Sequence, residues 1–380
     1  EIKNTTGGTA WAADNSHFFY VKKNVQTLRS EKVFRHNIES PGDLDPLIFH
    51  EKDETFSVYV QESKSMEYVF IASYSTLTTE YQFIQAESPL SEFQLIQERT
   101  RGLEYSVAHF EDHFYILNNK DGATNFKISK TPVDQTTSEN WVDLLAHRDE
   151  VLLEDFQIFK EFWVVAEREQ GLSKLKVKRW DETEDYFIPV AGETYSLYGG
   201  YNPSFDTSTF RFGFTSLKTP SSVFEYDMES KTQTLLKQQH VIDSNFDVDN
   251  YVEKRLWAKS RDGVQIPISI VHHKNVAYSS ETPLLLYAYG SYGSTVDPGF
   301  SSNRLSLLDR GFIFAIAHIR GGEYLGRQWY ENGKLQSKKN TFNDFIDASQ
   351  YLITEGYTSA DHLHALGGSA GGLLMGAVVN

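Results

Sequence analysis

Short apolar stretches recur along the first two-thirds of the chain at nearly equal intervals. Five of them begin with an aromatic residue, and their starts lie 50, 46, 48 and 48 residues apart. These stretches are Phe18–Val21, Tyr68–Ile71, Phe114–Leu117, Phe162–Val165 and Phe210–Gly213. After a polar turn, each is followed by a second alternating stretch: Val33–His36, Tyr81–Ile84, Phe126–Ile128, Leu175–Val177 and Val223–Tyr226. Alternation of this kind predicts strands with one buried face, joined by tight turns.

A period of about 48 residues with several short strands and no long helix is typical of β-propeller blades. The alternative is an ordinary all-β domain whose strands happen to be evenly spaced, and the five near-equal intervals favour the propeller. About five blades are visible before residue 250. Because a closed propeller usually needs more, we expect the remaining blades to precede Glu1. A propeller by itself is a binding scaffold and indicates no chemistry.

The pattern changes at about residue 250, so we predict a propeller over residues 1–250 and a second domain over 251–380. An alternating strand is predicted over Val264–His272. Leu284–Tyr287 and Phe312–Ile319 are short continuous apolar runs that end at glycines, which predicts strands buried on both faces of a parallel sheet. A helix follows, with Thr341 as its N-cap and Asp344 completing a capping box, and it ends at Glu355–Gly356. Its expected buried face consists of Phe342, Phe345, Ile346, Leu352 and Ile353.

A glycine-rich turn then joins the predicted strand Leu363–Leu366 to a small-residue run from Leu373 onwards, which predicts a buried helix. Within the turn, Gly367-x-Ser369-x-Gly371 matches the nucleophile elbow of α/β-hydrolases. A serine on so sharp a strand-to-helix turn needs small neighbours, and the backbone N–H of Ala370 then lies where an oxyanion would form. The alternatives are a tightly packed strand–helix turn or a phosphate-binding loop, although the lysine and spacing of a P-loop are absent.

Composition narrows the function further. The chain has 40% hydrophobic residues, 14% aromatic residues and a net charge of −16, which favours packed β-rich domains and disfavours binding to nucleic acid or an anionic membrane. There is no cysteine, which excludes disulfides, thiol catalysis and zinc–thiolate sites. His272-His273 lacks a third ligand at a recognisable spacing, so no metal and no cofactor are expected. No apolar run approaches the length of a membrane span.

The last hundred residues resemble the prolyl oligopeptidase family of serine peptidases, and within it the oligopeptidase B branch. The segments that carry the resemblance are Tyr287–Gly293, Arg304–Phe312, His318–Glu323, Leu325–Lys334, Asn340–Asp344 and Gly367–Gly376. Ala370 and Gly326–Tyr330 favour the oligopeptidase B branch. The first part of the chain resembles the same proteins more loosely, at Phe34–His36 and Glu51–Thr55. One departure is Arg320-Gly-Gly-Glu, where many relatives have a third glycine.

The resemblance implies a β-propeller followed by the N-terminal part of an α/β-hydrolase domain. It also implies that the Tyr289 hydroxyl is a second oxyanion donor; from the residues alone, Tyr289 would be a core tyrosine at a strand end. The catalytic histidine and aspartate, and the acids that select arginine or lysine, are expected beyond Asn380. The implied protein is a cytoplasmic oligopeptidase that cleaves short peptides after basic residues, and the 380-residue chain alone is expected to be inactive without the rest of the catalytic domain.

Other polar residues near these motifs have structural explanations. His318 precedes Ser369, whereas the histidine of an α/β-hydrolase triad follows the serine, so His318 is expected to be structural. Asp344 and Asp347 are expected on the helix surface or in a cap. Arg320, Glu323 and Arg327 are expected to form an ion-pair network. Two other functions remain open: a serine esterase or thioesterase on the same fold, and a non-enzymatic propeller that binds partners.

Overall fold

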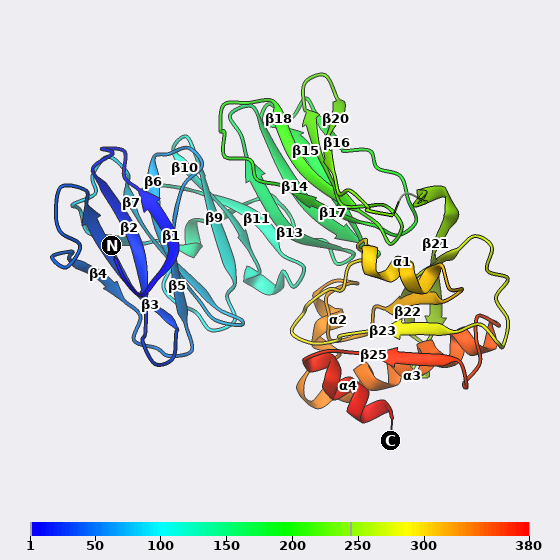
Figure 1. Ribbon diagram of the computed structural model, residues 1–380. Helices are drawn as coiled ribbons and strands as arrows, with labels where there is room; N and C mark the ends of the chain where they lie inside the picture. The colour runs from blue at the N-terminus through cyan, green and yellow to red at the C-terminus, as the bar shows by residue number, and fades with distance from the viewer. Residues whose placement is uncertain (1, 244, 380) are drawn as a thin grey trace. The chain divides into compact units, whose positions relative to one another are not determined.

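The computed structural model describes residues 2–243 and 245–379, and in this part of the chain the strands form five four-stranded sheets followed by one five-stranded sheet (Figure 1). The first two sheets contain β1 (Thr5–Trp11), β2 (His17–Lys23), β3 (Ser30–Asn37) and β4 (Leu47–His50), and then β5 (Ser57–Glu62), β6 (Tyr68–Tyr74), β7 (Thr79–Gln85) and β8 (Gln94–Leu95). The third contains β9 (Tyr105–Phe110), β10 (His113–Asn118), β11 (Lys127–Pro132) and β12 (Val142–Leu145). The fourth and fifth contain β13 (Val151–Ile158), β14 (Phe162–Glu169), β15 (Leu172–Arg179) and β16 (Asp185–Phe187), and then β17 (Ser196–Gly199), β18 (Thr209–Thr215), β19 (Ser222–Asp227) and β20 (Thr232–Gln238).

The repeated aromatic stretches are the second strands of these sheets, β2, β6, β10, β14 and β18, and the stretches that follow them are the third strands. The second strands carry the most deeply buried side chains, such as Phe19, Phe70 and Phe114. The fourth strands left little signal because they are short or exposed; every residue of β20 is exposed. Four strands per repeat is the composition of a propeller blade.

The five-stranded sheet has the order β21-β22-β24-β23-β25. Its strands are β21 (Tyr251–Lys259), β22 (Gln265–His273), β23 (Leu284–Tyr287), β24 (Ile313–Ala317) and β25 (Leu363–Leu366). β23 pairs in parallel with both β24 and β25, whereas β22 pairs antiparallel with β21 and β24. The predicted strands are therefore present, and β21 is an additional strand. The helices are α1 (Ser302–Leu308), α2 (Arg327–Glu331), α3 (Lys338–Thr354) and α4 (Ala370–Val378), with 3-10 turns at Lys120–Gly122, Ser138–Asn140, Val248–Asn250 and Leu335–Ser337.

Alternate residues of the five-stranded sheet pack into two cores. Leu284, Leu286, Ile313 and Ala315 belong to one core, which also contains α3 and α4 residues such as Leu374. The intervening residues Leu285, Phe314 and Ile316 face a second core with Leu305 and Leu308 of α1. Helices therefore cover both faces of the sheet, as continuous apolar strands require. Figure 1 shows α3 and α4 together on the same side of the sheet as one another.

Two helix predictions need correction. Helix α3 begins at Lys338, three residues before Thr341, so Thr341 is not the N-cap. Its buried residues are Thr341, Asp344, Phe345, Ala348 and Leu352, whereas Ile346 is 41% exposed. The buried face was misassigned because two of its positions are polar side chains that find buried partners. Helix α4 is mostly exposed rather than buried: within the described chain its buried residues are Gly371 and Leu374, while Met375 and Val378 pack against the core and stay partly exposed.

Contacts divide the chain into two compact units: residues 2–148, 155–163 and 203–207, and residues 149–154, 164–202 and 208–379. Within the second unit, residues of the repeat region contact the α/β part directly. Arg168 of β14 donates to both carboxylate oxygens of Asp297, at 2.8 and 3.0 Å, and to Glu154 at 2.7 Å. A second contact joins the hydroxyls of Thr194 and Ser269 at 2.6 Å. These hydrogen bonds and the Arg168–Asp297 ion pair connect the α/β part to the neighbouring part of the repeat region.

Candidate active site

Ser369 lies at the apex of the turn between β25 and α4. Its backbone has φ 54° and ψ −120°, a conformation that costs a non-glycine residue free energy and persists only where packing enforces it. Its side chain is exposed, because the turn lifts it off the end of the sheet. A sharp turn with an exposed serine at its tip is the geometry of the nucleophile elbow that the sequence predicts.

The two glycines of the motif are required by close contacts. A Cβ atom at Gly367 would lie 2.4 Å from the carbonyl oxygen of Gly371. A Cβ atom at Gly371 would lie 2.9 Å from the carbonyl oxygen of Ala288, at the end of β23. By contrast, a Cβ atom at Gly368 or Gly372 would meet no described atom within 4 Å. The tight packing therefore depends on the two motif glycines and not on their neighbours.

This difference gives a testable pair of variants. We expect Gly371→Ala to shift the first turn of α4 away from β23 and to slow the reaction of Ser369 with a fluorophosphonate by about tenfold or more, since small displacements of reacting groups are costly. Gly372→Ala should leave labelling unchanged and slightly stabilise α4, because alanine is the better helix former by about 1 kcal/mol. Equal labelling rates for both variants would contradict the role of the Gly371 contact. The measurement is the rate of covalent labelling in the full-length protein.

The same contact brings Tyr289 beside the elbow. The Cβ position of Gly371 lies 3.6 Å from Tyr289 Cα and 3.8 Å from Tyr289 Cδ2. Parallel pairing of Tyr287 with Leu366 aligns the carboxyl ends of β23 and β25, which is the edge where ligands bind in open α/β sheets. Ala370 is the first residue of α4, so its N–H has no acceptor within the helix. Of the three predicted site residues, Ser369 and Ala370 are adjacent in the turn, and Tyr289 packs against the helix that they begin.

His318, one residue beyond β24, has a structural environment. Its ring is buried, stacks on Tyr324 at a centroid distance of 3.6 Å, and its Nε2 is 2.8 Å from Ser269 Oγ. Burial, together with the charges of Arg255 and Arg168, lowers the pKa of His318 well below its ordinary value, so the ring stays neutral. Among the described residues no hydrogen bond joins a histidine to Ser369, and a base beyond Asn380 stays a prediction.

Asp344 was expected on the helix surface or in a cap, and this was wrong. It is fully buried and accepts hydrogen bonds from the backbone N–H, Nε and Nη2 of Arg320, at 3.0, 2.8 and 2.5 Å. Arg320 also donates to Asp262 at 2.6 Å. Burial alone would lower the pKa of Arg320, but the hydrogen bonds to Asp344 and Asp262 raise it above its ordinary value.

Arg320 and Arg327 were expected in one ion-pair network, but they bind different carboxylates. Arg320 binds Asp344 and Asp262, while Arg327 pairs with Glu323 at 2.7 Å. Asp347, one turn after Asp344 in α3, pairs with the exposed guanidinium of Arg261 at 2.7 Å. The Arg320 pair links the end of β24 to α3 and so supports the glycine loop that follows.

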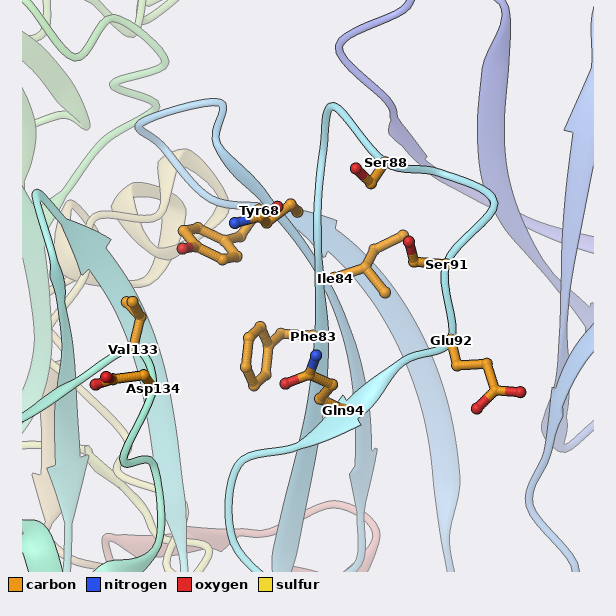
Figure 2. Close-up of a pocket in the computed structure, with 10 residues that line it drawn as sticks. Tyr68, Phe83, Ile84, Ser88, Ser91, Glu92, Gln94, Val133 and Asp134 are labelled. Atoms are coloured by element: carbon orange, nitrogen blue, oxygen red, sulfur yellow. The ribbon is translucent and has the colours of Figure 1, made fainter.

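A pocket elsewhere in the chain is a weaker candidate for a catalytic site. Between the second and third four-stranded sheets lies a pocket of about 280 Å³, and Figure 2 shows Tyr68, Phe83 and Val133 among the residues that line it. Its carboxylates, Glu92 and Asp134, are exposed and lie on opposite sides of the view. No histidine lines it, so its serines have no base. In residues 2–243 and 245–379 no group of three potential metal ligands occurs, and no helix is long and apolar enough to cross a membrane.

Comparison with known proteins agrees with this geometry. The family described as prolyl oligopeptidase, N-terminal beta-propeller domain, matches residues 1–239, and the one described as prolyl oligopeptidase family matches residues 298–380. Dipeptidyl aminopeptidase BI of Pseudoxanthomonas mexicana is 42% identical over 100% of this chain and 52% of its own length. Protease 2 of Moraxella lacunata is 37% identical over 98% of this chain and 53% of its own length.

Solved structures give the same result. Oligopeptidase B from Leishmania major superimposes with a TM-score of 0.92 at 34% identity, covering 99% of this chain and 54% of its own. Oligopeptidase B from Trypanosoma brucei with covalently bound antipain has a TM-score of 0.93 at 32% identity, covering 100% and 55%. The chain thus spans about half the length of the relatives it matches. The predicted fold class, a β-propeller leading into the start of a peptidase domain, is confirmed, and the chain belongs to the prolyl oligopeptidase family.

Proposed function

We propose that the full-length protein carrying this chain is a serine peptidase whose nucleophile is Ser369. The observation that supports this most directly is the left-handed backbone of Ser369 at the exposed tip of a turn between a parallel strand and a helix. A serine that only packed there would gain nothing from such strain. The domain boundary at residue 250 and the cytoplasmic location stay predictions.

The proposed reaction is acyl transfer in two steps. Ser369 Oγ attacks the peptide carbonyl carbon while a histidine from the remainder of the catalytic domain takes the hydroxyl proton. The oxyanion accepts hydrogen bonds from the Ala370 N–H and the Tyr289 hydroxyl. The C–N bond then breaks, and the histidine returns the proton to the departing amine. Water releases the acyl group by the same route in reverse.

The Tyr289 hydroxyl can be tested directly. We expect Tyr289→Phe to lower kcat by about 10²–10³, the cost of losing one oxyanion donor, while KM changes little. The phenyl ring would retain the packing against α4, so the fold should be preserved. Steady-state kinetics with a peptide amide measures the effect. A kcat within twofold of the parent would show that Tyr289 only packs at the strand end.

For the substrate we propose short peptides cleaved after arginine or lysine. Support comes from the oligopeptidase B structures that match the chain and from its net charge of −16, which attracts cationic peptides. The residues that would form the specificity pocket are expected in the remainder of the catalytic domain. The 380-residue chain alone should therefore be inactive.

A second candidate is removal of dipeptides from a free amino terminus, because a relative named dipeptidyl aminopeptidase is 42% identical to this chain. The two activities differ in whether the substrate needs a free amine. An N-blocked arginyl amide should be cleaved only by an oligopeptidase, whereas a dipeptidyl amide with a free amino group is the substrate of a dipeptidyl aminopeptidase. Comparing kcat/KM for the two distinguishes them. A simple ester hydrolysed far faster than either would favour the esterase.

The nucleophile is tested by labelling the full-length protein with a fluorophosphonate and mapping the adduct by mass spectrometry. We expect the label on Ser369. Absence of label on the folded protein would contradict the assignment and favour a propeller that binds partners without catalysis.

A further inference from the structure

A lysine side chain forms hydrogen bonds with the turn that follows Tyr289. Lys338, the first residue of α3, donates hydrogen bonds from Nζ to the Gly290 carbonyl oxygen at 2.5 Å and to Ser291 Oγ at 2.7 Å. Both acceptors follow Tyr289 directly in the chain. The lysine lies 48 residues away in sequence, so only the tertiary fold brings it to this turn.

The ammonium group of Lys338 serves this turn and not an ion pair. No carboxylate lies within salt-bridge distance of Lys338 among residues 2–243 and 245–379. The side chain is half-buried, and burial lowers its pKa from the ordinary value. A cation at the first residue of a helix also meets the positive end of the helix dipole, which is unfavourable. So costly a placement needs a compensating contact, and the two hydrogen bonds to the turn supply it.

Gly290 is also closely packed by backbone and side-chain atoms of other segments. A Cβ atom at Gly321 would lie 2.1 Å from the Gly290 carbonyl oxygen, and a Cβ atom at Gly290 would lie 2.5 Å from Thr341 Cγ2. Gly290 itself has φ 68°. The carbonyl of Gly290 is thus confined by the Gly321 backbone and bound by Lys338. Further along the turn, the Gly293 N–H donates to the Gly321 carbonyl oxygen at 3.0 Å, and the Gly293 carbonyl oxygen accepts from the Glu323 N–H at 3.2 Å. Lys338 adds the side-chain hydrogen bonds at Gly290 and Ser291, the two residues next to Tyr289.

We propose that Lys338 is a positioning residue that holds the Tyr289 hydroxyl in its oxyanion-binding place by fixing the Gly290–Ser291 turn. This inference rests on the proposed function of Tyr289. Lys338 contacts neither the elbow nor, by this proposal, the substrate. It acts through the backbone of Gly290, the residue next to Tyr289. This contact connects the start of α3 with the proposed oxyanion site.

A double-mutant cycle in the full-length protein tests the proposal. We expect Lys338→Met to lower kcat for a peptide amide by about 10- to 100-fold, part of the about 10²–10³ that the donor itself contributes, with KM within about twofold. In a Tyr289→Phe background the same substitution should lower kcat by no more than about twofold, because the hydroxyl that it positions is gone. Lys338→Arg, which keeps the donors, should restore part of kcat.

The matched control is Lys339→Met, since Lys339 is the adjacent lysine and is exposed. It should leave kcat unchanged in both backgrounds. An equal loss from Lys338→Met with and without the Tyr289 hydroxyl would overturn the proposal and indicate a general structural role. No loss in either background would overturn it as well.

Two other results would separate the proposal for Lys338 from the proposed oxyanion role of Tyr289. If Tyr289→Phe alone leaves kcat unchanged while Ser369 still takes the fluorophosphonate, the oxyanion role of Tyr289 is wrong and the positioning role of Lys338 is wrong with it. If Tyr289→Phe lowers kcat but Lys338→Met does not, only the Lys338 proposal is wrong. Should Lys338→Met fail to fold, Ser291→Ala removes one of its two acceptors and should lower kcat about 2- to 5-fold, again only when the Tyr289 hydroxyl is present. An unchanged kcat for Ser291→Ala would then contradict the proposal.

Discussion

Replacing Ser369 with alanine should abolish peptide cleavage by the full-length protein. The expected loss in kcat is on the order of 10⁶, because the group that forms the acyl-enzyme is removed and the remaining oxyanion donors have no nucleophile to assist. Substrate binding should persist, since the exposed hydroxyl contributes little to the packing of the turn. Rates with an arginyl amide and labelling with a fluorophosphonate measure the two parts of this prediction.

The control for this variant is Ser306→Ala, which removes an exposed serine hydroxyl from α1 of the same sheet domain. It should retain full activity and full labelling. Cleavage by the Ser369→Ala protein at more than a few per cent of the parent rate would mean that another residue attacks the peptide. The proposed function would then be wrong for this serine, whatever the fold.

The second large effect concerns stability. Asp344→Asn should destabilise the α/β part by about 3–5 kcal/mol, because it leaves Arg320 buried without its main counter-charge. Asparagine is nearly the same size, so lost packing would not account for the change. The side chain of Asp344 is fully buried and holds Arg320 by three hydrogen bonds. A lowered melting temperature of the full-length protein, followed by circular dichroism, measures it.

Asp347→Asn is the matched control, one turn further along α3. Its partner Arg261 is 51% exposed, and a pair that is open to water contributes about 0.2–1 kcal/mol. It should therefore change the melting temperature much less than Asp344→Asn does. Similar shifts for the two variants would show that burial does not set the strength of the Arg320 pair. The charge removed is the same in both, so net charge cannot explain a difference.

Several elements of the fold could be predicted because their signal is local. The second strand of each blade is apolar over successive residues, and β6, β10 and β14 are buried on both faces, so a short aromatic-rich run marks this strand in every repeat. The elbow shows in the sequence because a strained turn between a strand and a helix requires small residues at fixed positions around Ser369. The predicted strand at Leu363–Leu366 has the bounds that the structure gives to β25.

Other features were missed because nothing nearby in the sequence marks them. β20 is wholly exposed, so it has no apolar period. The buried face of α3 was misassigned because Thr341 and Asp344 are polar, and their acceptors and donors lie in other loops. Lys338 did have a possible signal, since a lysine at a helix start opposes the helix dipole. Such a lysine indicates that some acceptor compensates for the unfavourable dipole, but the sequence does not show which residue it is.

The sequence by itself determined the blade repeat and indicated an α/β pattern after it, with a candidate nucleophile. Each of these depends on residues close together in the chain, whose spacing follows from the geometry of one strand or one turn. The tertiary structure alone decided that Gly371 packs on Ala288, that Asp344 is buried with Arg320, and that Lys338 holds the turn after Tyr289. The Arg320–Asp344 and Lys338–Gly290 contacts join residues 24 and 48 positions apart, and Gly371 and Ala288 are still further apart in the sequence. Sequence spacing carries no record of them, because only the packing of α3, α4 and the strands of the five-stranded sheet brings those segments together.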